Sequence, residues 1–276
     1  MRMPGPASIA ISFAARVTPS GLSDMDRTFL AKPAATTPAS KPFELQSGVY
    51  SEASGDTPCA LLAPMHYEPG YAYPLIVWLH GSGTEERQLL RVMPLVSMRN
   101  YVAVAPRGTF CEDGDRPARG YQWQQTEQHI VLAEHRVFES METACSKYHI
   151  DERRVFLAGS DSGGTMALRI ALAHPYCFRG VISLGGPLPA GRTPFGSLAE
   201  ARRLPVLVAA GQRSTACPPE LLCDSLRLLH TAGMAVTFRQ YPGDQTLSPQ
   251  MLADVDRWMI EQITSPRPDR ACSDAD

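Results

Sequence analysis

The sequence predicts an α/β protein with three layers, in which a mostly parallel central sheet carries helices on both faces. Two observations favour this fold class. Short continuous apolar runs of strand length recur along the chain, and segments with apolar residues at helical spacing lie between them. Strands that alternate with helices pair in parallel, and the ligands of such sheets bind outside the carboxyl ends of the strands. Functional residues are therefore expected directly after the strands.

The individual elements follow from the apolar pattern and from the positions of glycine and proline. Two early strands, at residues 48–53 and 59–67, are expected to pair as a hairpin. Buried strands are predicted at 74–81, 101–108, 154–159, 180–186, 204–211 and 235–241, and helices at 124–147, 163–174, 219–231 and 249–263. Pro175 stops the second of these helices, and Pro219 suits the first turn of the third.

Composition fits a single large domain, which we place at residues 43–265 of the 276-residue chain. Residues 1–42 and 266–276 are rich in small and polar residues and proline, so we expect both segments to be disordered. The net charge of −2 does not favour nucleic acid or an anionic membrane as a partner. No apolar run approaches the roughly 18 residues that a membrane-spanning helix needs.

Cysteine usage indicates the compartment. The seven cysteines are scattered without a C-x-x-C pair, which favours free thiols and a cytoplasmic location. A short apolar run at residues 9–15 leaves a weak N-terminal signal peptide open, although Arg16 follows it directly and no convincing cleavage site is present.

Four stretches of the chain together resemble one known family. They are PLIVWLHGSG (74–83), VFLAGSDSGGTMAL (155–168), LPVLVAAGQRSTACPP (204–219) and VTFRQYPGDQTLSPQMLADVDRWM (236–259). In this order they resemble the α/β-hydrolase superfamily, and most closely its phospholipase/carboxylesterase branch, which includes acyl-protein thioesterases. The resemblance spans most of residues 43–265 and implies descent from an enzyme that acts on acyl esters or thioesters.

The resemblance also implies where a catalytic triad would lie. The family places a serine on a strained strand-to-helix turn, a histidine that takes its proton and an acid that orients the histidine. Gly159 and Gly163 frame the turn, and the residue midway between them is Asp161. The acid position holds Ser214 and the histidine position holds Gln245. All three triad positions are thus substituted.

The loop that precedes the turn retains the family pattern. The resemblance assigns His80, Gly81, Ser82 and Gly83 to the loop that supplies an oxyanion donor. The N–H of Ser82 or Gly83 would serve together with the N–H of Ser162. A pocket could thus persist without the reaction, and a small acyl-ester-like ligand or a protein partner is expected. Neither a cofactor nor a metal ion is expected, and the sequence leaves the oligomeric state open.

Several interpretations of the turn remain open. A degenerate hydrolase is favoured, because an amide at Gln245 cannot relay protons. Haloalkane dehalogenases and epoxide hydrolases share the fold and use an aspartate here, but their ester intermediate needs a histidine for its hydrolysis. A shifted register would make Ser162 or Ser160 the nucleophile of an active ester or thioester hydrolase. Cys217, which lies near the acid position, is a further alternative nucleophile. Without any such role, Asp161 would be a helix cap.

Overall fold

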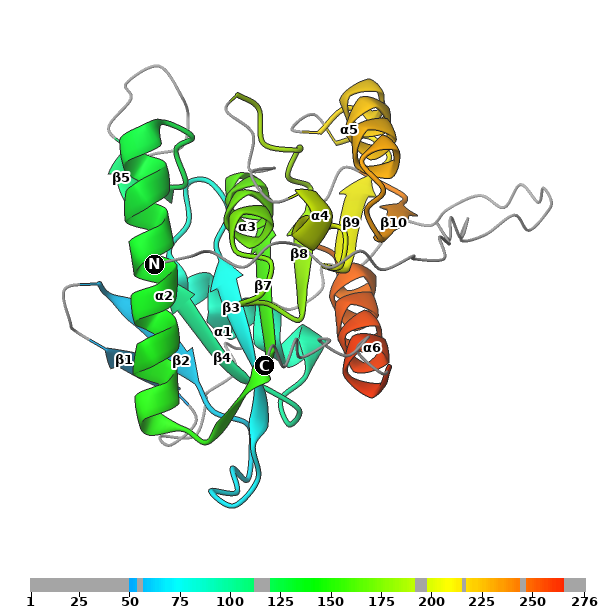
Figure 1. The fold of residues 1–276 in the computed structure, drawn as a ribbon. Coiled ribbons are helices and arrows are strands. Elements are labelled where there is room, and N and C mark those ends of the chain that lie inside the picture. Colours follow the sequence, from blue (N-terminus) through cyan, green and yellow to red (C-terminus); the bar gives the residue numbers. More distant parts are fainter. Residues whose placement is uncertain are drawn as a thin grey trace, which may run out of the picture.

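The computed structural model describes residues 50–53, 57–111, 120–191, 198–214, 217–243 and 247–265. It confirms the predicted α/β architecture, in which helices cover a central sheet (Figure 1). The strands of the main sheet are β1 (Tyr50–Ala53), β2 (Cys59–Leu62), β3 (Tyr73–Leu79), β4 (Val102–Pro106), β7 (Ile150–Ser160), β8 (Gly180–Leu184), β9 (Val206–Gly211) and β10 (Val236–Tyr241).

The sheet has eight strands in the order β1-β2-β4-β3-β7-β8-β9-β10. The predicted hairpin is confirmed, because β1 pairs antiparallel with β2 and Tyr50 lies opposite Leu62. β2 is also antiparallel to β4, whereas all pairs from β4 to β10 are parallel. The carboxyl ends of six strands therefore share one edge, where a ligand site is expected.

Helices cover both faces of the sheet. The helices are α1 (Leu89–Val96), α2 (Glu127–Lys147), α3 (Ser162–Ala173), α4 (Leu198–Ala201), α5 (Pro219–Thr231) and α6 (Pro249–Thr264). Buried residues of α2, α3 and α5 join one apolar cluster, and those of α1 and α6 join a second. The two clusters lie on opposite faces because successive side chains of each strand point to opposite sides.

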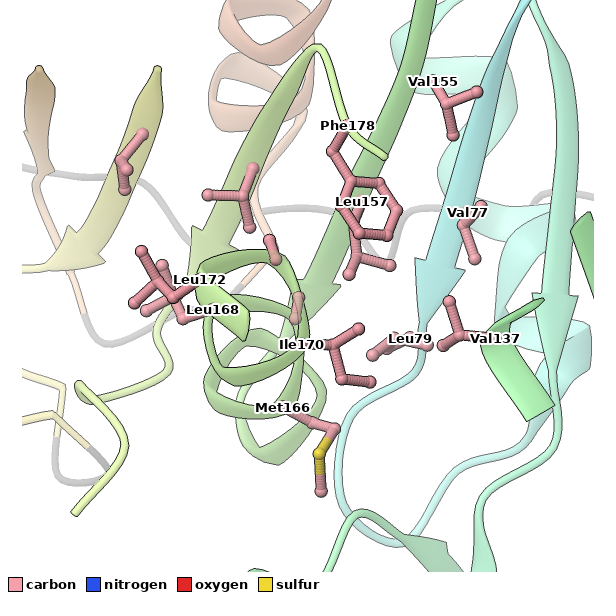
Figure 2. Packing of buried hydrophobic residues seen from close by; sticks show 14 of the residues in the cluster. Val77, Leu79, Val137, Val155, Leu157, Met166, Leu168, Ile170, Leu172 and Phe178 are labelled. Carbon is pink, nitrogen blue, oxygen red and sulfur yellow. The ribbon is translucent and has the colours of Figure 1, made fainter. Parts of the chain in front are cut away.

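The central strand β3 shows this alternation directly. Leu75, Val77 and Leu79 enter the cluster beside α3, whereas Ile76 and Trp78 enter the cluster beside α1 and α6. In Figure 2, α3 lies beside the ends of the strands, with Ile170 near Leu79 and with Leu157 next to Phe178. Burial on both faces explains why the inner strands read as continuous apolar runs in the sequence.

The structure corrects several predicted boundaries. β2 ends at Leu62, five residues before the predicted end, and β7 begins at Ile150, four residues before the predicted start. The sequence interpretation missed α1 and the 3₁₀ turn η1 (Glu86–Gln88) that precedes it. Pro94 lies inside α1 and breaks a backbone hydrogen bond there, which hides a helix from pattern analysis. The sequence interpretation also missed α4 and the small antiparallel pair of β5 (Thr109–Cys111) and β6 (Gly120–Gln122).

Some predictions fall on residues outside the described ranges. The expected disorder of residues 1–42 and 266–276 stays a prediction for this reason. Within the ranges given above, no helix has both the length and the apolarity that crossing a membrane demands.

The start of α3 approaches β3 closely enough to require glycine. A Cβ atom added at Gly163 would lie 2.3 Å from the carbonyl oxygen of Leu79 and 2.5 Å from that of His80. Both contacts involve backbone, which cannot rotate away. Gly163 therefore sets the distance between the helix and the sheet.

We predict that Gly163→Ala lowers the free energy of unfolding by about 3 kcal/mol or more, since the overlap must be relieved by moving α3. Gly70→Ala is the matched control, because an added Cβ there meets nothing within 4 Å. Its effect should stay within about 0.5 kcal/mol. Urea denaturation measures both, and equal stabilities of the two variants would contradict the close packing.

Candidate functional site

The carboxyl ends of five neighbouring strands meet at one edge of the sheet (Figure 1). In register, Leu79 of β3 lies beside Gly159 of β7, and Ser160 of β7 lies beside Leu184 of β8. β9 and β10 end side by side at Gly211 and Tyr241. The candidate residues taken from the sequence lie at the ends of these strands or in the segments that follow them, so the topology brings the described ones to a common edge.

Asp161 occupies the turn between β7 and α3. Its backbone has φ 52° and ψ −124°, a conformation that non-glycine residues rarely adopt. Its N–H donates to the carbonyl of Leu184 at 2.9 Å, and its own carbonyl accepts from Thr165 N at 3.1 Å. A Cβ at Gly159 would lie 2.5 Å from Gly163, so the turn is closed tightly. The tight turn between β7 and α3 is therefore centred on Asp161.

The side chain of Asp161 is not a helix cap. Asp161 stands at the N-cap position of α3, but its carboxylate makes no capping hydrogen bond. Instead, Oδ2 accepts the backbone N–H of Ser82 at 3.2 Å, across 79 residues of sequence. The helix-cap interpretation of this side chain is therefore wrong. The carboxylate joins the turn to the loop after β3.

The HGSG loop (residues 80–83) is held by its own hydrogen bonds. Thr84 donates to the carbonyl of Gly81 through both its N–H, at 3.2 Å, and its hydroxyl, at 2.6 Å. Gly83 has φ 74°, as the third residue of a tight turn requires, and its N–H donates to the carbonyl of Tyr121 at 3.0 Å. Gly83 therefore does not offer a free donor. Of the N–H groups of residues 81–83, which the structure describes, that of Ser82 alone donates to Asp161.

Gln88, which the sequence interpretation missed, fixes the HGSG loop by accepting a backbone hydrogen bond from it. The buried Gln88 lies in η1, and its Oε1 accepts from Trp78 Nε1 at 2.9 Å and from Gly81 N at 3.2 Å. The same oxygen accepts from Ser160 Oγ at 3.3 Å. One side chain thus links β3, the HGSG loop and the end of β7. The available sequence signal was the position of Gln88, a polar residue directly before an apolar pattern with helical spacing (Leu89, Val92, Met93).

His80 is a structural residue of the loop. Its ring is fully buried, and Nε2 accepts the N–H of Gly108 at 2.9 Å while Nδ1 lies 3.0 Å from the carbonyl of Gly81. Both nitrogens are therefore engaged by backbone, in the neutral form with a proton on Nδ1. Burial lowers the pKa of His80 below its ordinary value. His80 does not serve as a base at the elbow.

The alternative nucleophiles have no histidine partner. Ser162, the first residue of α3, accepts the hydroxyl proton of Ser82 with an Oγ–Oγ distance of 2.9 Å. Ser160 is buried and donates to Gln88. Cys217 is buried too, and burial raises the pKa of its thiol. Among the described residues, neither Ser162 Oγ nor Cys217 Sγ is hydrogen-bonded to a histidine nitrogen.

Ser214 lies in the loop after β9. It is buried, its N–H donates to Gly211 O at 3.2 Å, and its Oγ accepts from Cys217 N at 3.3 Å. This loop lies beside the segment that follows β10, because Arg213 N donates to Gly243 O at 2.9 Å. Gln245 lies two residues further on and outside the described residues. The structure thus joins the backbones of the two loops that carry the acid and histidine positions.

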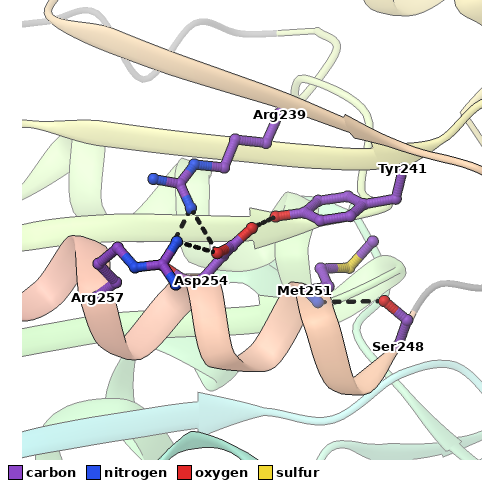
Figure 3. A network of polar contacts seen from close by, with 6 residues as sticks. All are labelled: Arg239, Tyr241, Ser248, Met251, Asp254 and Arg257. Carbon is purple, nitrogen blue, oxygen red and sulfur yellow. Dashed lines mark hydrogen bonds and ion pairs between the residues drawn. The ribbon is translucent and has the colours of Figure 1, made fainter. Parts of the chain in front are cut away.

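A polar network fixes the strand and helix on either side of the Gln245 loop. Tyr241, the last residue of β10, donates to Asp254 Oδ2 of α6 at 2.7 Å (Figure 3). Burial raises the pKa of Tyr241, and the hydrogen bond to Asp254 raises it further. Arg239 and Arg257 pair with Asp254 Oδ1 at 3.1 Å and 2.7 Å. Ser248 caps α6 by accepting Met251 N at 3.1 Å. Both ends of the loop are therefore anchored.

A hollow of about 580 Å³ lies against the HGSG loop. Its lining includes Gly83, Thr84, Gln88, Leu90, Arg91 and Tyr121. Arg107 holds Tyr121 of this lining in place, because it pairs with the buried Glu86 (Nε to Oε2, 2.6 Å) and its guanidinium lies over the Tyr121 ring at 4.9 Å from the centroid. No set of three or more His, Cys, Asp or Glu side chains suited to a metal ion occurs in the described part of the chain.

The burial of His80 predicts an acid-sensitive fold. The pKa of His80 is lowered in the folded protein, so below about pH 6.5 the unfolded chain takes up a proton that the folded protein does not. Stability should therefore fall as the pH drops below about 6.5. His80→Gln should flatten this slope in urea titrations between pH 7 and pH 5 by up to about 1.4 kcal/mol per pH unit.

The exposed His135 provides the control for that measurement. His135→Gln should retain the wild-type slope. An unchanged slope in His80→Gln would mean that the lowered pKa of His80 is not the source of the acid sensitivity.

Comparison with known proteins identifies the family. Arabidopsis thaliana SOBER1 is 21% identical and matches with a TM-score of 0.59 over 70% of this chain and 100% of its own. A Mesorhizobium loti carboxylesterase is 19% identical, with a TM-score of 0.62 over 77% and 99%. A Bacillus cereus carboxylesterase is 17% identical, with a TM-score of 0.60 over 76% and 96%. The model of the Esterase family, described as "Putative esterase", matches residues 51–216. The chain belongs to this family and has the α/β-hydrolase fold.

Proposed function

We propose that this chain is a degenerate member of the Esterase family that binds a ligand at the elbow and does not turn over esters by the serine mechanism. One observation carries the proposal. The carboxylate of Asp161, the residue that the resemblance assigns to the nucleophile position, accepts the Ser82 N–H, the donor that a substrate oxyanion would need. The side chain therefore takes the place of both a nucleophile and an oxyanion.

The electrostatics of this contact oppose ester hydrolysis. A tetrahedral intermediate carries negative charge on its oxygen, and a preorganised N–H must be free to receive it. Here the N–H already binds a carboxylate, whose charge would repel a second anion at hydrogen-bonding distance. Ser162 Oγ, the neighbouring hydroxyl, is occupied by Ser82 and has no base in contact.

The missing base is the second support. His80 is neutral, buried and saturated by backbone, so it cannot relay a proton to the elbow. Gln245 at the histidine position has no titratable group. Ser214 at the acid position holds the N–H of Cys217, a role that suits loop structure. The retained backbone is then best explained by binding of a small ligand or a protein partner.

One observation favours a second candidate, in which Asp161 itself attacks carbon. Its Oδ2 is held by the Ser82 N–H, while Oδ1 has no partner among the described residues. A carboxylate anchored through one oxygen presents the other as a nucleophile. Attack on an epoxide would form an ester and break the ring C–O bond, and the alkoxide would take a proton from water. Without a base at position 245, that ester would remain on the protein.

The proposal predicts how ester hydrolysis responds to restoring the triad. Wild type should not hydrolyse a short-chain p-nitrophenyl ester above the buffer rate. Asp161→Ser/Ser214→Asp/Gln245→His should exceed wild type by about 100-fold or more, whereas each single change should gain little because triad members act as a unit. Initial rates at neutral pH measure this.

The matched control is Asp161→Ala/Ser214→Asp/Gln245→His, which carries the same two partners without a nucleophile and should stay inactive. Turnover by wild type that Asp161→Ala abolishes would overturn the proposal.

The second candidate is separated by intact-mass measurement after incubation with phenyl glycidyl ether. Our proposal predicts no adduct on wild type beyond the level found on Asp161→Asn. A single adduct, with a mass increase of one epoxide molecule and absent from Asp161→Asn, would favour the alkylation chemistry instead.

A further inference from the structure

We infer that the elbow selects ligands presenting an ammonium group or another strong hydrogen-bond donor, and rejects carboxylates. The inference rests on the proposed function and specifies the ligand class of the same site. It starts from the inventory of hydrogen-bonding atoms around Asp161. The family arrangement offers donors to an oxyanion at this place, but in this chain a carboxylate stands at the turn and binds the Ser82 N–H.

The first acceptor is the free oxygen of the carboxylate. Asp161 is partly exposed, its Oδ2 is bound by Ser82 N at 3.2 Å, and no described residue donates to Oδ1. Within the described ranges, no lysine, arginine or histidine pairs with this carboxylate. Its charge is therefore balanced by backbone N–H groups and solvent, and a ligand cation could replace that solvent.

Two hydroxyl oxygens add to the acceptor set. Ser82 and Ser162 are both partly exposed and flank Asp161 from different elements, the loop after β3 and the first turn of α3. Ser82 Oγ donates to Ser162 Oγ at 2.9 Å, which leaves lone pairs on Ser82 Oγ. An ammonium group has three donors and no acceptor, so a carboxylate oxygen and a hydroxyl oxygen suit it.

The donors of the HGSG loop that would attract an anion are already used, which leaves the N–H of Ser162 in the first turn of α3 as the remaining oxyanion donor. Gly81 N is bound to Gln88, Ser82 N to Asp161, and Gly83 N to Tyr121. All three N–H groups of this loop segment thus have internal acceptors. A carboxylate ligand would meet the charge of Asp161 without gaining a loop N–H, and such like-charge contacts are unfavourable.

Three probes of equal chain length test the inference on the wild-type protein: n-butylammonium, n-butanol and butyrate. Backbone amide NMR shifts of Ser82 and Ser162 report binding at the elbow and give each Kd. We expect n-butylammonium to bind about 10-fold or more tightly than n-butanol, as a charge-assisted hydrogen bond provides. Butyrate should bind more weakly than n-butanol.

Variants reverse the preference. Asp161→Asn should lose the roughly 10-fold advantage of n-butylammonium, and Asp161→Ser, which frees the Ser82 N–H, should bind butyrate more tightly than wild type does. Asp224→Asn is the matched control, because it removes one negative charge from an exposed position on α5. Its probe ranking should equal that of wild type.

Wild-type binding of butyrate as tight as that of n-butylammonium, or shifts confined to residues away from Ser82 and Ser162, would overturn the inference. This test needs no variant and therefore holds even if a substitution at position 161 impairs folding. The outcome is also separable from the proposed function. Ester turnover by wild type would contradict the proposed loss of catalysis, whereas the ranking of the three probes alone decides the ligand class.

Discussion

The close packing of the α3 start against the ends of β3 and β7 is the constraint on which the rest of the site depends. Gly163 lies against the carbonyls of Leu79 and His80, so the helix, the central strand and the loop after it have fixed relative positions. Asp161, between β7 and this helix start, has a rare backbone conformation, and its carboxylate accepts the N–H of Ser82 in the loop after β3. The polar chemistry of the elbow follows from a steric requirement of the fold.

Around that constraint, the molecule retains the backbone of a hydrolase while the side chains serve different ends. His80 supports the loop through two backbone contacts, Gln88 holds three donors, and Ser214 closes a turn. The network of Asp254 anchors the loop after β10. Each of these contacts stabilises a loop or strand end at the carboxyl edge of the sheet, and none of them supplies a proton relay.

The fold and the location of the elbow could be predicted from the sequence, because buried parallel strands and the spacing of Gly159 and Gly163 are local patterns. The contact between Asp161 and Ser82 could not, since the two residues are 79 positions apart and either could have turned to solvent. Gln88 was missed for a related reason. Pro94 concealed α1, the helix that directly follows Gln88 in the sequence. The hydrogen-bond partners of Gln88 also come from three separate segments.

The hub formed by Gln88 has a consequence for recognition. Its amide oxygen ties β3, the HGSG loop and β7 together through contacts within the protein itself, so the order of this part of the site comes from the fold. When a ligand binds there, the HGSG loop therefore loses little conformational entropy. Small compounds should meet a preformed surface, and selectivity among them should reflect their shape and charge rather than their power to reorganise the chain.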